Sequence, residues 1–224
     1  MHPWNLAPRD AIALQRELAA NVALTPLAEE PVHIGGCDVS MNRFAKEGFA
    51  GFVTLSYPNL ETLATSAVKE TIPFPYVPGL LSFREIPMLL SAWERLSEKP
   101  DVLLVDGIGI AHPRRLGIAS HLGLILDLPT VGCAKSVLIG TYEEPGNERG
   151  DWTPLSDPKT GEILGAALRT KPNVQPLFVS PGHRITLEDS LALVLKTVRK
   201  HRLPEPTRQA HLLVNEARRK DFAS

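Results

Sequence analysis

Three short runs of strand type follow one another in the first third of the chain. Each is rich in β-branched, aromatic or small apolar residues, and only short turn-like breaks separate them. Strands in such close succession favour an antiparallel meander, because tight turns are enough to join them. The three runs span residues 33–41, 49–57 and 62–70.

Helical periodicity comes before and after these runs. One helix is predicted over 8–24 and a second over 79–98. Within the second, Pro87 marks either a kink or a later start, because proline lacks the N–H that a helix interior needs. The apolar face of the first helix consists of Ala11, Leu14, Leu18 and Val22.

The pattern changes after residue 100. The run DVLLVDG at 101–107 is almost continuously apolar, which indicates a strand buried on both faces. A helix is then predicted over 116–126 and another strand over 129–136. Such alternation of strand, helix and strand is typical of a parallel sheet.

Two further strands and two helices complete the predicted order. The strands are expected over 161–170 and 176–182. Thr186, with Asp189 three residues later, is typical of a helix N-cap, and a last helix is predicted over 207–220.

A meander, a helix and then alternating strands and helices predict an α/β fold with a mixed central sheet flanked by helices. The ribonuclease H-like fold has this order of elements. Because the chain contains no internal repeat, low-complexity tract or linker, we expect a single catalytic domain over residues 1–224.

Composition narrows the function classes. The 224 residues are 43% hydrophobic and 22% charged, as in ordinary globular proteins, and the formal net charge of -1 argues against binding nucleic acid by bulk electrostatics. No signal peptide or membrane-spanning run is visible, so we expect a cytoplasmic protein. Cys37 and Cys133 lie in apolar strand-like runs without zinc-site spacing, and we expect both to be reduced core residues.

The segment FPYVPGLLSFRE at 74–85 holds Tyr76 between two prolines. Proline fixes its own φ and restricts the residue before it, so the tyrosine ring is expected to have few available positions. A ring held in this way suits a wedge or a lid. The alternative is a buried tyrosine in a rigid loop, and the segment taken by itself slightly favours that alternative.

Three acidic residues are placed for metal binding. Asp38 lies in a buried-looking strand, Asp106 ends another, and Glu85 is on the helix between them. If they converge, two unit charges about 4 Å apart repel by about 4 kcal/mol at an effective dielectric constant near 20, which a cation would reverse. Oxygen ligands suit Mg²⁺ or Mn²⁺ and hence phosphodiester hydrolysis. The alternative is that the acids cap helices or form salt bridges.

The chain has no complete cofactor-binding motif, and several other polar residues are expected to stabilise the fold. GIGIAH at 107–112 resembles the start of a dinucleotide fingerprint, but the third glycine is missing and Pro113 intrudes. We find no P-loop, nucleophile elbow or cysteine-pair metal motif and expect no organic cofactor. Asp101 is expected to cap the start of a strand, and His121 and His183 are expected to be structural.

Seven segments, in order and covering nearly the whole chain, resemble the endonuclease V family of deoxyinosine 3′-endonucleases. They are GCDVS around Asp38, FPYVPGLLSFRE with Tyr76 and Glu85, KPDVLLVDG with Asp106, IAHPRRLGIASHLG with His112, GCAKS with Lys135, FVSPGH with His183, and PEPTRQAH with His211.

The resemblance implies a Mg²⁺-dependent DNA-repair nuclease of ribonuclease H-like fold, with Mn²⁺ as a substitute. It implies recognition of hypoxanthine in DNA and a cut at the second phosphodiester bond 3′ to it, leaving 3′-hydroxyl and 5′-phosphate ends. Asp38 and Asp106 would be direct metal ligands, and Glu85 a ligand, directly or through water. Lys135 would face the scissile phosphate, and His211 would be a catalytic or metal-associated residue. From its place after an apolar strand, Lys135 could equally make an ordinary salt bridge.

On the substrate side, the resemblance makes Tyr76 a wedge beside the damaged base. Pro78 and Gly79 belong to the same arm and are expected to contact DNA. His112 and Arg114 are predicted to contact phosphate, with the following helix N-terminus adding its dipole. Without the resemblance, a plain surface loop is the favoured interpretation of this segment.

The chain departs from the family pattern at Ile108, between the glycines of DGIG, where the family carries His or Gln. Two alternatives stay open beside the DNA enzyme. One is an inosine-specific endoribonuclease, because the sequence does not show what a 2′-hydroxyl would meet. The other is a nucleic-acid-binding relative without turnover, for which Ile108 is the motivation. We expect the protein to be a monomer that does not associate with membranes.

Overall fold

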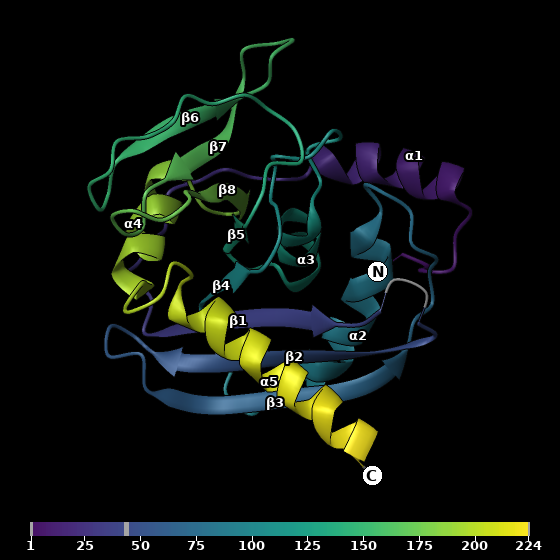
Figure 1. The fold of residues 1–224 in the computed structure, drawn as a ribbon. Coiled ribbons are helices and arrows are strands. Elements are labelled where there is room, and N and C mark those ends of the chain that lie inside the picture. The colour runs from purple at the N-terminus through teal and green to yellow at the C-terminus, as the bar shows by residue number, and fades with distance from the viewer. Residues whose placement is uncertain (1, 43–44, 224) are drawn as a thin grey trace.

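The computed structural model describes residues 2–42 and 45–223, except for the side chains of residues 222 and 223. In this part of the chain one eight-stranded mixed sheet is flanked by helices (Figure 1). The strands are β1 (His33–Ser40), β2 (Glu47–Ser56), β3 (Thr62–Thr71), β4 (Val102–Val105), β5 (Thr130–Ala134), β6 (Trp152–Ser156), β7 (Ile163–Leu168) and β8 (Leu177–His183). The helices are α1 (Pro8–Ala19), α2 (Leu81–Arg95), α3 (Ile118–Leu126), α4 (Leu187–Thr197) and α5 (Glu205–Ala223).

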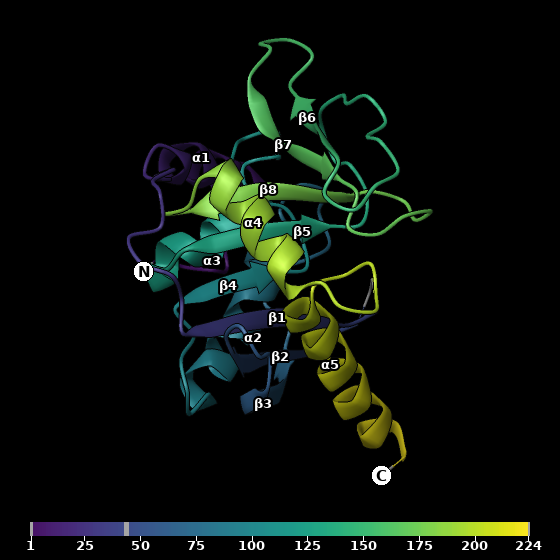
Figure 2. The same cartoon turned by 90° about the vertical axis from the view of Figure 1, so that its left-hand side faces the viewer.

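The strand order is β3-β2-β1-β4-β5-β8-β7-β6, which Figure 2 shows from the side with β3 at the bottom and β6 near the top. The first three strands form the predicted antiparallel meander, and β1, β4 and β5 run parallel. A meander that continues into two parallel strands in this order is the ribonuclease H-like arrangement. The predicted fold class is therefore confirmed.

Burial follows from position in the sheet. The parallel strands β4 and β5 are buried along their whole length, since helices cover both faces. The edge strand β3 instead alternates between buried and exposed residues, because α2 covers one of its faces while α5 covers the other only in part.

Helices cover both faces of the sheet. In Figure 1, α5 crosses in front of β1 to β3 and α2 lies behind them. Residues of α4 and α5, such as Val194 and Ala210, pack with Ile34 in one core cluster. Residues of α2 and α3, such as Leu89 and Leu122, form the second.

Several predicted boundaries were wrong. The first helix ends at Ala19 rather than at residue 24, because the backbone of Ala23 is bonded instead to His183 and Arg184 at the end of β8. The helix α2 runs through Pro87, so this residue does not mark its start. The edge strand β6 was missed because WTPLS is short and contains a proline, which an edge strand tolerates.

Three smaller predictions are confirmed. The Thr186 side chain caps α4 by accepting a hydrogen bond from the Asp189 N–H at 3.1 Å. One carboxylate oxygen of Asp101 accepts the N–H groups of Val32 and His33, at 2.9 and 2.8 Å, where β1 begins. Both cysteines are buried and unpaired. Among the described helices, none is long and apolar enough to cross a membrane.

Candidate active site

The pairing of β1 with β4 brings two aspartates together. The strands run parallel in a register that sets Cys37 opposite Val105. Asp38 follows Cys37 within β1, and Asp106 directly follows the last residue of β4. The two aspartates therefore lie side by side at the carboxyl end of the parallel part of the sheet. This edge is where ligands bind in open α/β sheets.

A glycine lets α5 approach these aspartates. A Cβ at Gly36 would lie 2.1 Å from the Pro206 carbonyl oxygen, so any side chain there would push the start of α5 away from β1. With the helix this close, His211 Nδ1 lies 2.7 Å from Asp38 Oδ2. The close contact between strand and helix therefore delivers the imidazole to the carboxylate pair.

Asp38, Asp106 and His211 form a group that can hold a metal ion. Each offers one ligand atom, and these atoms lie within 4.8 Å of one another. The two carboxylates supply the oxygen ligands that Mg²⁺ and Mn²⁺ prefer, whereas an imidazole nitrogen is not a usual ligand of Mg²⁺. Glu85 is not part of this group but lies near it, on the first turns of α2.

Electrostatics show that the carboxylates are crowded. Burial, and then the charge of Asp106, raise the pKa of Asp38. Burial raises the pKa of Glu85 to about 8, with further contributions from the charges of Asp38 and Asp106. Because negative charge is held here at an energetic cost, a divalent cation would be attracted, and the donor set fits one.

A cation, Lys135, contacts one of these carboxylates. It directly follows β5, and its Nζ lies 2.5 Å from Asp106 Oδ2. Arg202 donates to the Lys135 carbonyl oxygen at 3.0 Å, which fixes the backbone at this strand end. Lys135 thus stands beside the carboxylate pair, within reach of an anion bound there.

Asn215 was missed by the sequence analysis. Its Oδ1 accepts the Ser40 hydroxyl at 2.9 Å, and its Nδ2 donates to the His211 carbonyl at 2.8 Å and lies 3.1 Å from His211 Nε2. Since this Nδ2 is a donor, Nε2 accepts, and the imidazole proton sits on Nδ1, facing Asp38. In this arrangement His211 orients Asp38, and the carboxylates are the groups left to ligate a metal. The i,i+4 spacing of His211 and Asn215 on α5 was the available signal.

A cavity of 310 Å³ joins the carboxylates to the tyrosine arm, which we define as residues 74–79. Its lining includes Glu85, Asp106 and Tyr76. Ile108, the departure from the family pattern, also lines it. The tyrosine side chain is 38% exposed, so the alternative of a buried core tyrosine is wrong.

Hydrogen bonds to one carbonyl hold the arm. Gly79 has a φ of +77°, which favours glycine, and its carbonyl oxygen accepts from Arg114 Nη2 at 2.7 Å and from Gln15 Nε2 at 3.1 Å. His112 Nε2 lies 3.0 Å from the same oxygen. Pro78 precedes this turn and lines the cavity.

His112 is fully engaged in this network. Its Nδ1 accepts the Arg114 N–H at 3.1 Å, so Nε2 carries the proton given to Gly79. Burial, and then the charge of Arg114, lower the pKa of His112 to about 4. The contact of His112 and Arg114 with phosphate stays a prediction; in this structure both side chains brace the arm.

His121 and His183 make structural contacts. His121 is fully buried and lies 3.0 Å from the Ser82 hydroxyl and 2.8 Å from His2 Nε2. Nδ1 of the buried His183 accepts the Ala23 N–H at 3.2 Å. Both expectations are confirmed.

Comparison with known proteins places these features in a family. The model of the endonuclease V family matches residues 16–212, which is most of the chain. The chain belongs to the endonuclease V family. It is 50% identical to endonuclease V of Gloeobacter violaceus over 98% of this chain and 89% of that protein. It is 48% identical to endonuclease V of Myxococcus xanthus, over 97% of this chain and 92% of the relative.

Solved structures of endonuclease V superpose on nearly the whole chain. The Streptomyces avermitilis protein has a TM-score of 0.92 at 39% identity, covering 98% of this chain and 96% of that one. Endonuclease V of Ciona intestinalis, in complex with a 23mer DNA containing an inosine followed by a ribo-adenosine, has a TM-score of 0.80 at 28% identity. That match covers 96% of this chain and 99% of that one.

Proposed function

We propose that the protein is a Mg²⁺-dependent endonuclease that recognises deoxyinosine in DNA. It hydrolyses the second phosphodiester bond 3′ to the lesion and leaves 3′-hydroxyl and 5′-phosphate ends. The observation that carries the proposal is one cavity lined both by the tyrosine arm and by the carboxylates Glu85 and Asp106.

The carboxylates would hold the metal. Asp38 and Asp106 are the proposed direct ligands, with Glu85 acting directly or through water, and Mn²⁺ would substitute for Mg²⁺. When bound, such an ion supplies a hydroxide nucleophile near neutral pH and stabilises charge on the leaving oxygen. His211 keeps Asp38 oriented through its Nδ1–H, and Lys135 offers its ammonium group to the scissile phosphate.

The cavity and the arm would select the base. A volume of 310 Å³ lies at the small end of the range for ligand pockets, about 300–1,000 Å³, which suits a single base. Flipping a base out of a duplex costs a few kcal/mol, and stacking on an aromatic ring returns about 1–3 kcal/mol per base. Because these terms nearly cancel, a weakly paired hypoxanthine would yield to Tyr76 while normal pairs resist.

The hydrogen bonds around Gly79 reduce the entropy that the arm loses on binding, so more of the stacking free energy contributes to base recognition. An arm that must be ordered upon binding loses part of its contact energy to conformational entropy. The hydrogen bonds from Gln15, His112 and Arg114 hold the arm in place before substrate arrives.

A nicking assay tests the proposal. The protein is incubated with Mg²⁺ and a 5′-labelled duplex that contains one deoxyinosine, beside the same duplex with deoxyadenosine. We expect one nick 3′ to the deoxyinosine and none in the control. Absence of a nick at enzyme excess would refute the proposal.

Matched oligonucleotides with ribo- or deoxyribo-inosine separate the DNA enzyme from the RNA alternative. Binding without cutting in both Mg²⁺ and Mn²⁺ would support the relative without turnover. Ile108 lines the cavity rather than belonging to the carboxylate group, so we expect turnover. A single domain, a monomeric state and a cytoplasmic location stay predictions from the sequence.

A further inference from the structure

A row of hydrogen bonds connects the N-terminal segment to the cavity lined by the tyrosine arm and the carboxylates, which we call the base cavity. His2 Nδ1 lies 2.9 Å from the Pro3 carbonyl oxygen, and His2 Nε2 lies 2.8 Å from His121 Nε2. His121 Nδ1 lies 3.0 Å from Ser82 Oγ, and Ser82 lines the base cavity. Two histidines that do not line the cavity are therefore linked to a serine that does.

The positions of the protons in this row follow from its first acceptor. The Pro3 carbonyl can only accept, so His2 Nδ1 carries a proton, and when His2 is neutral its Nε2 carries none. The proton between the two rings therefore belongs to His121 Nε2, which donates to His2.

The second ring passes this order on to Ser82. His121 is fully buried, and burial, followed by the charge of His2, lowers its pKa to about 3. The His121 ring is therefore neutral, and with its one proton on Nε2 its Nδ1 must accept. The Ser82 hydroxyl is consequently the donor in its bond to His121.

Aromatic packing holds this arrangement. The centroid of the His121 ring lies 5.0 Å from that of His2, 5.2 Å from that of Phe83 and 5.6 Å from that of Trp4. Because these rings are close-packed, His121 cannot turn over without moving its neighbours. The single hydroxyl hydrogen of Ser82 stays directed at His121, so any further hydrogen bond to Ser82 Oγ is one that the oxygen accepts.

Most polar side chains of the base cavity already have another task, in the proposed metal site, in the proposed wedge or in the bonds that hold the arm. They are Gln15, Tyr76, Glu85, Asp106 and His112. Two serines remain among the described lining side chains, Ser82 and Ser136. Ser136 is exposed, so water can replace its contacts, whereas Ser82 is only 3% exposed. A mismatch with a base is more costly at Ser82, because a buried polar group is expensive to leave unpaired.

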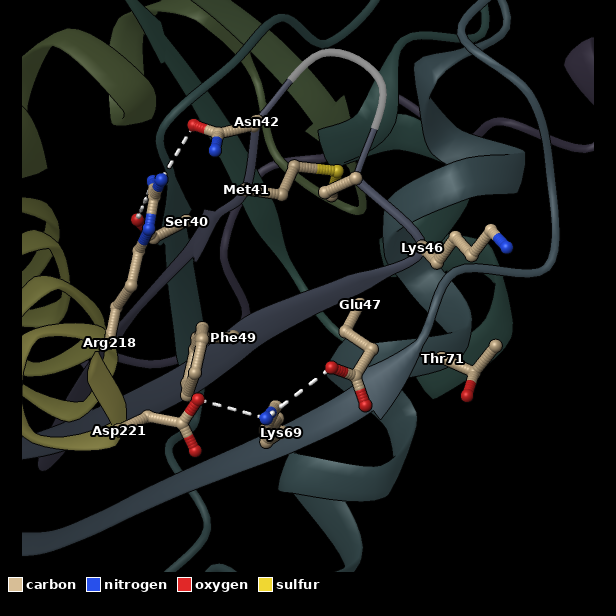
Figure 3. A pocket seen from close by; sticks show the side chains of 11 residues that line it. Ser40, Met41, Asn42, Lys46, Glu47, Phe49, Lys69, Thr71, Arg218 and Asp221 are labelled. Atoms are coloured by element: carbon tan, nitrogen blue, oxygen red, sulfur yellow. Dashed lines mark hydrogen bonds and ion pairs between the residues drawn. The ribbon is translucent and has the colours of Figure 1, made fainter. Parts of the chain in front are cut away.

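A larger hollow between α5 and the segments that flank the β1–β2 connection is separate from the base cavity (Figure 3). The described linings of the two share no residue. In Figure 3, Lys69 stands between Glu47 and Asp221, at 3.3 and 2.8 Å, so these charges offset one another. Discrimination between bases is therefore expected in the base cavity.

Hypoxanthine and adenine differ at N1. Hypoxanthine carries a hydrogen on N1 and donates it, whereas adenine presents a lone pair there. Enzymes that flip a base read it through hydrogen bonds to this Watson–Crick edge. An oxygen that can only accept matches the N1–H of hypoxanthine and opposes the N1 lone pair of adenine.

Resting on the proposed function, we propose that Ser82 Oγ accepts the N1–H of the flipped hypoxanthine and thereby determines specificity. His121 and His2 are positioning residues, because they direct the Ser82 hydrogen away from the base without touching it. The discrimination depends on the direction of one hydrogen, which a row of bonds from the N-terminal segment sets.

Binding of single-stranded oligonucleotides tests this assignment without cleavage. They carry either one deoxyinosine or one deoxynebularine, whose purine has an unprotonated N1 and no amino group. Binding is measured in EDTA at pH 8 by fluorescence anisotropy, and the use of single strands removes the cost of opening a base pair.

The proteins compared are the wild type, Ser82→Ala, His2→Phe and the control Ser120→Ala. Ser120 Oγ is buried without a hydrogen-bond partner among the described residues, and Ser120 is not a described lining residue of the base cavity. The control therefore removes a buried hydroxyl next to His121 in the chain without touching the row. Cooperative thermal unfolding checks that all four proteins are folded.

Ser82→Ala should lower the preference for deoxyinosine over deoxynebularine by about ten-fold, because one complex loses a hydrogen bond and the other loses a repulsion. His2→Phe keeps an aromatic ring but removes the acceptor for the His121 Nε2–H. The His121 proton then moves to Nδ1 and is donated to Ser82, which frees the hydroxyl hydrogen. This variant should therefore lose about two- to five-fold of the preference, and Ser120→Ala should match the wild type.

NMR shifts of the His121 ring nitrogens give a readout that packing alone would not change. The wild type should carry the ring proton on Nε2, and His2→Phe should carry it on Nδ1. A wild-type proton on Nδ1 would overturn the inference, because the Ser82 hydrogen would then be free to face the base.

Wild-type preference in Ser82→Ala or in His2→Phe would also overturn the inference, as would an equal loss of affinity for both oligonucleotides. The two proposals fail separately. A lost preference in Ser82→Ala without any nicking by the wild type would keep the base contact and refute the nuclease. Nicking by the wild type with an unchanged preference in Ser82→Ala would do the reverse.

Discussion

The pH dependence of stability tests the network that holds the tyrosine arm. His112 is 3% exposed, and both its ring nitrogens are used, one facing the Gly79 carbonyl and one accepting the Arg114 N–H. A second proton on the ring would sit on Nδ1 and oppose that N–H. The perturbation is therefore acid itself, compared between the wild type and His112→Gln, which keeps a donor near Gly79 but cannot titrate.

The expected magnitude comes from the pKa. Burial and the charge of Arg114 lower the pKa of His112 from its usual 6.5 to about 4 in the folded protein. Between these values the unfolded chain binds the proton and the folded chain does not, so the free energy of unfolding falls as pH falls from 6.5 to 4. At 1.36 kcal/mol per pKa unit, this loss is about 3 kcal/mol.

Urea unfolding at pH 7.5 and pH 4 measures this loss in the free energy of unfolding. The wild type should lose about 3 kcal/mol more than His112→Gln, with an unchanged m-value. His121, whose pKa burial lowers to about 3, loses stability in the same window but is present in both proteins and cancels. The exposed His201, changed to glutamine, is the matched control. Equal acid losses in the wild type and His112→Gln would refute the reasoning.

Three other predictions concern the site. Asp106→Asn should reduce nicking by about 100-fold or more, because the metal loses a carboxylate ligand. DNA binding measured in EDTA should stay equal or tighten, because the repulsion between Asp106 and phosphate is removed. Retained nicking would contradict this prediction. Tyr76→Ala should lower the preference for a deoxyinosine duplex over a normal duplex by about ten-fold, as expected from losing about 1–3 kcal/mol of stacking. On single strands the preference should fall less, because no base has to be wedged out of a duplex. Gly36→Ala places a Cβ 2.1 Å from the Pro206 carbonyl oxygen, so urea unfolding should show about 1–3 kcal/mol of destabilisation. Nicking should also fall, because His211 moves with α5. A variant as stable as the wild type would show that the contact is not tight.

Local patterns were enough for most elements. The three strands of the meander and the buried run before Asp106 were predicted because their apolar patterns match their burial in the sheet. The predictions failed where contacts distant in sequence decide the outcome. The end of α1 depends on bonds between Ala23 and the end of β8, and β6 exists because β7 offers it an edge to pair with.

The acidic residues illustrate what position in a predicted strand can reveal. Asp38 and Asp106 were candidates because an acid in or at the end of a buried strand needs a partner. Asn215, by contrast, lies in no predicted strand, and its signal in the sequence is only the i,i+4 spacing from His211. Its role depends on Ser40 and His211, which come from different elements and meet only when α5 packs on β1.

The sequence by itself determined the order of strands and helices, the acids at the strand ends, and the two prolines around the tyrosine. Each of these depends on a residue and its near neighbours, through periodicity, backbone restriction or the cost of burying charge. Only the tertiary structure decided that His211 reaches Asp38 and that Gly79 is held by three side chains. These features are distances between segments far apart in the chain, and such distances are set by packing and register, which no local pattern contains.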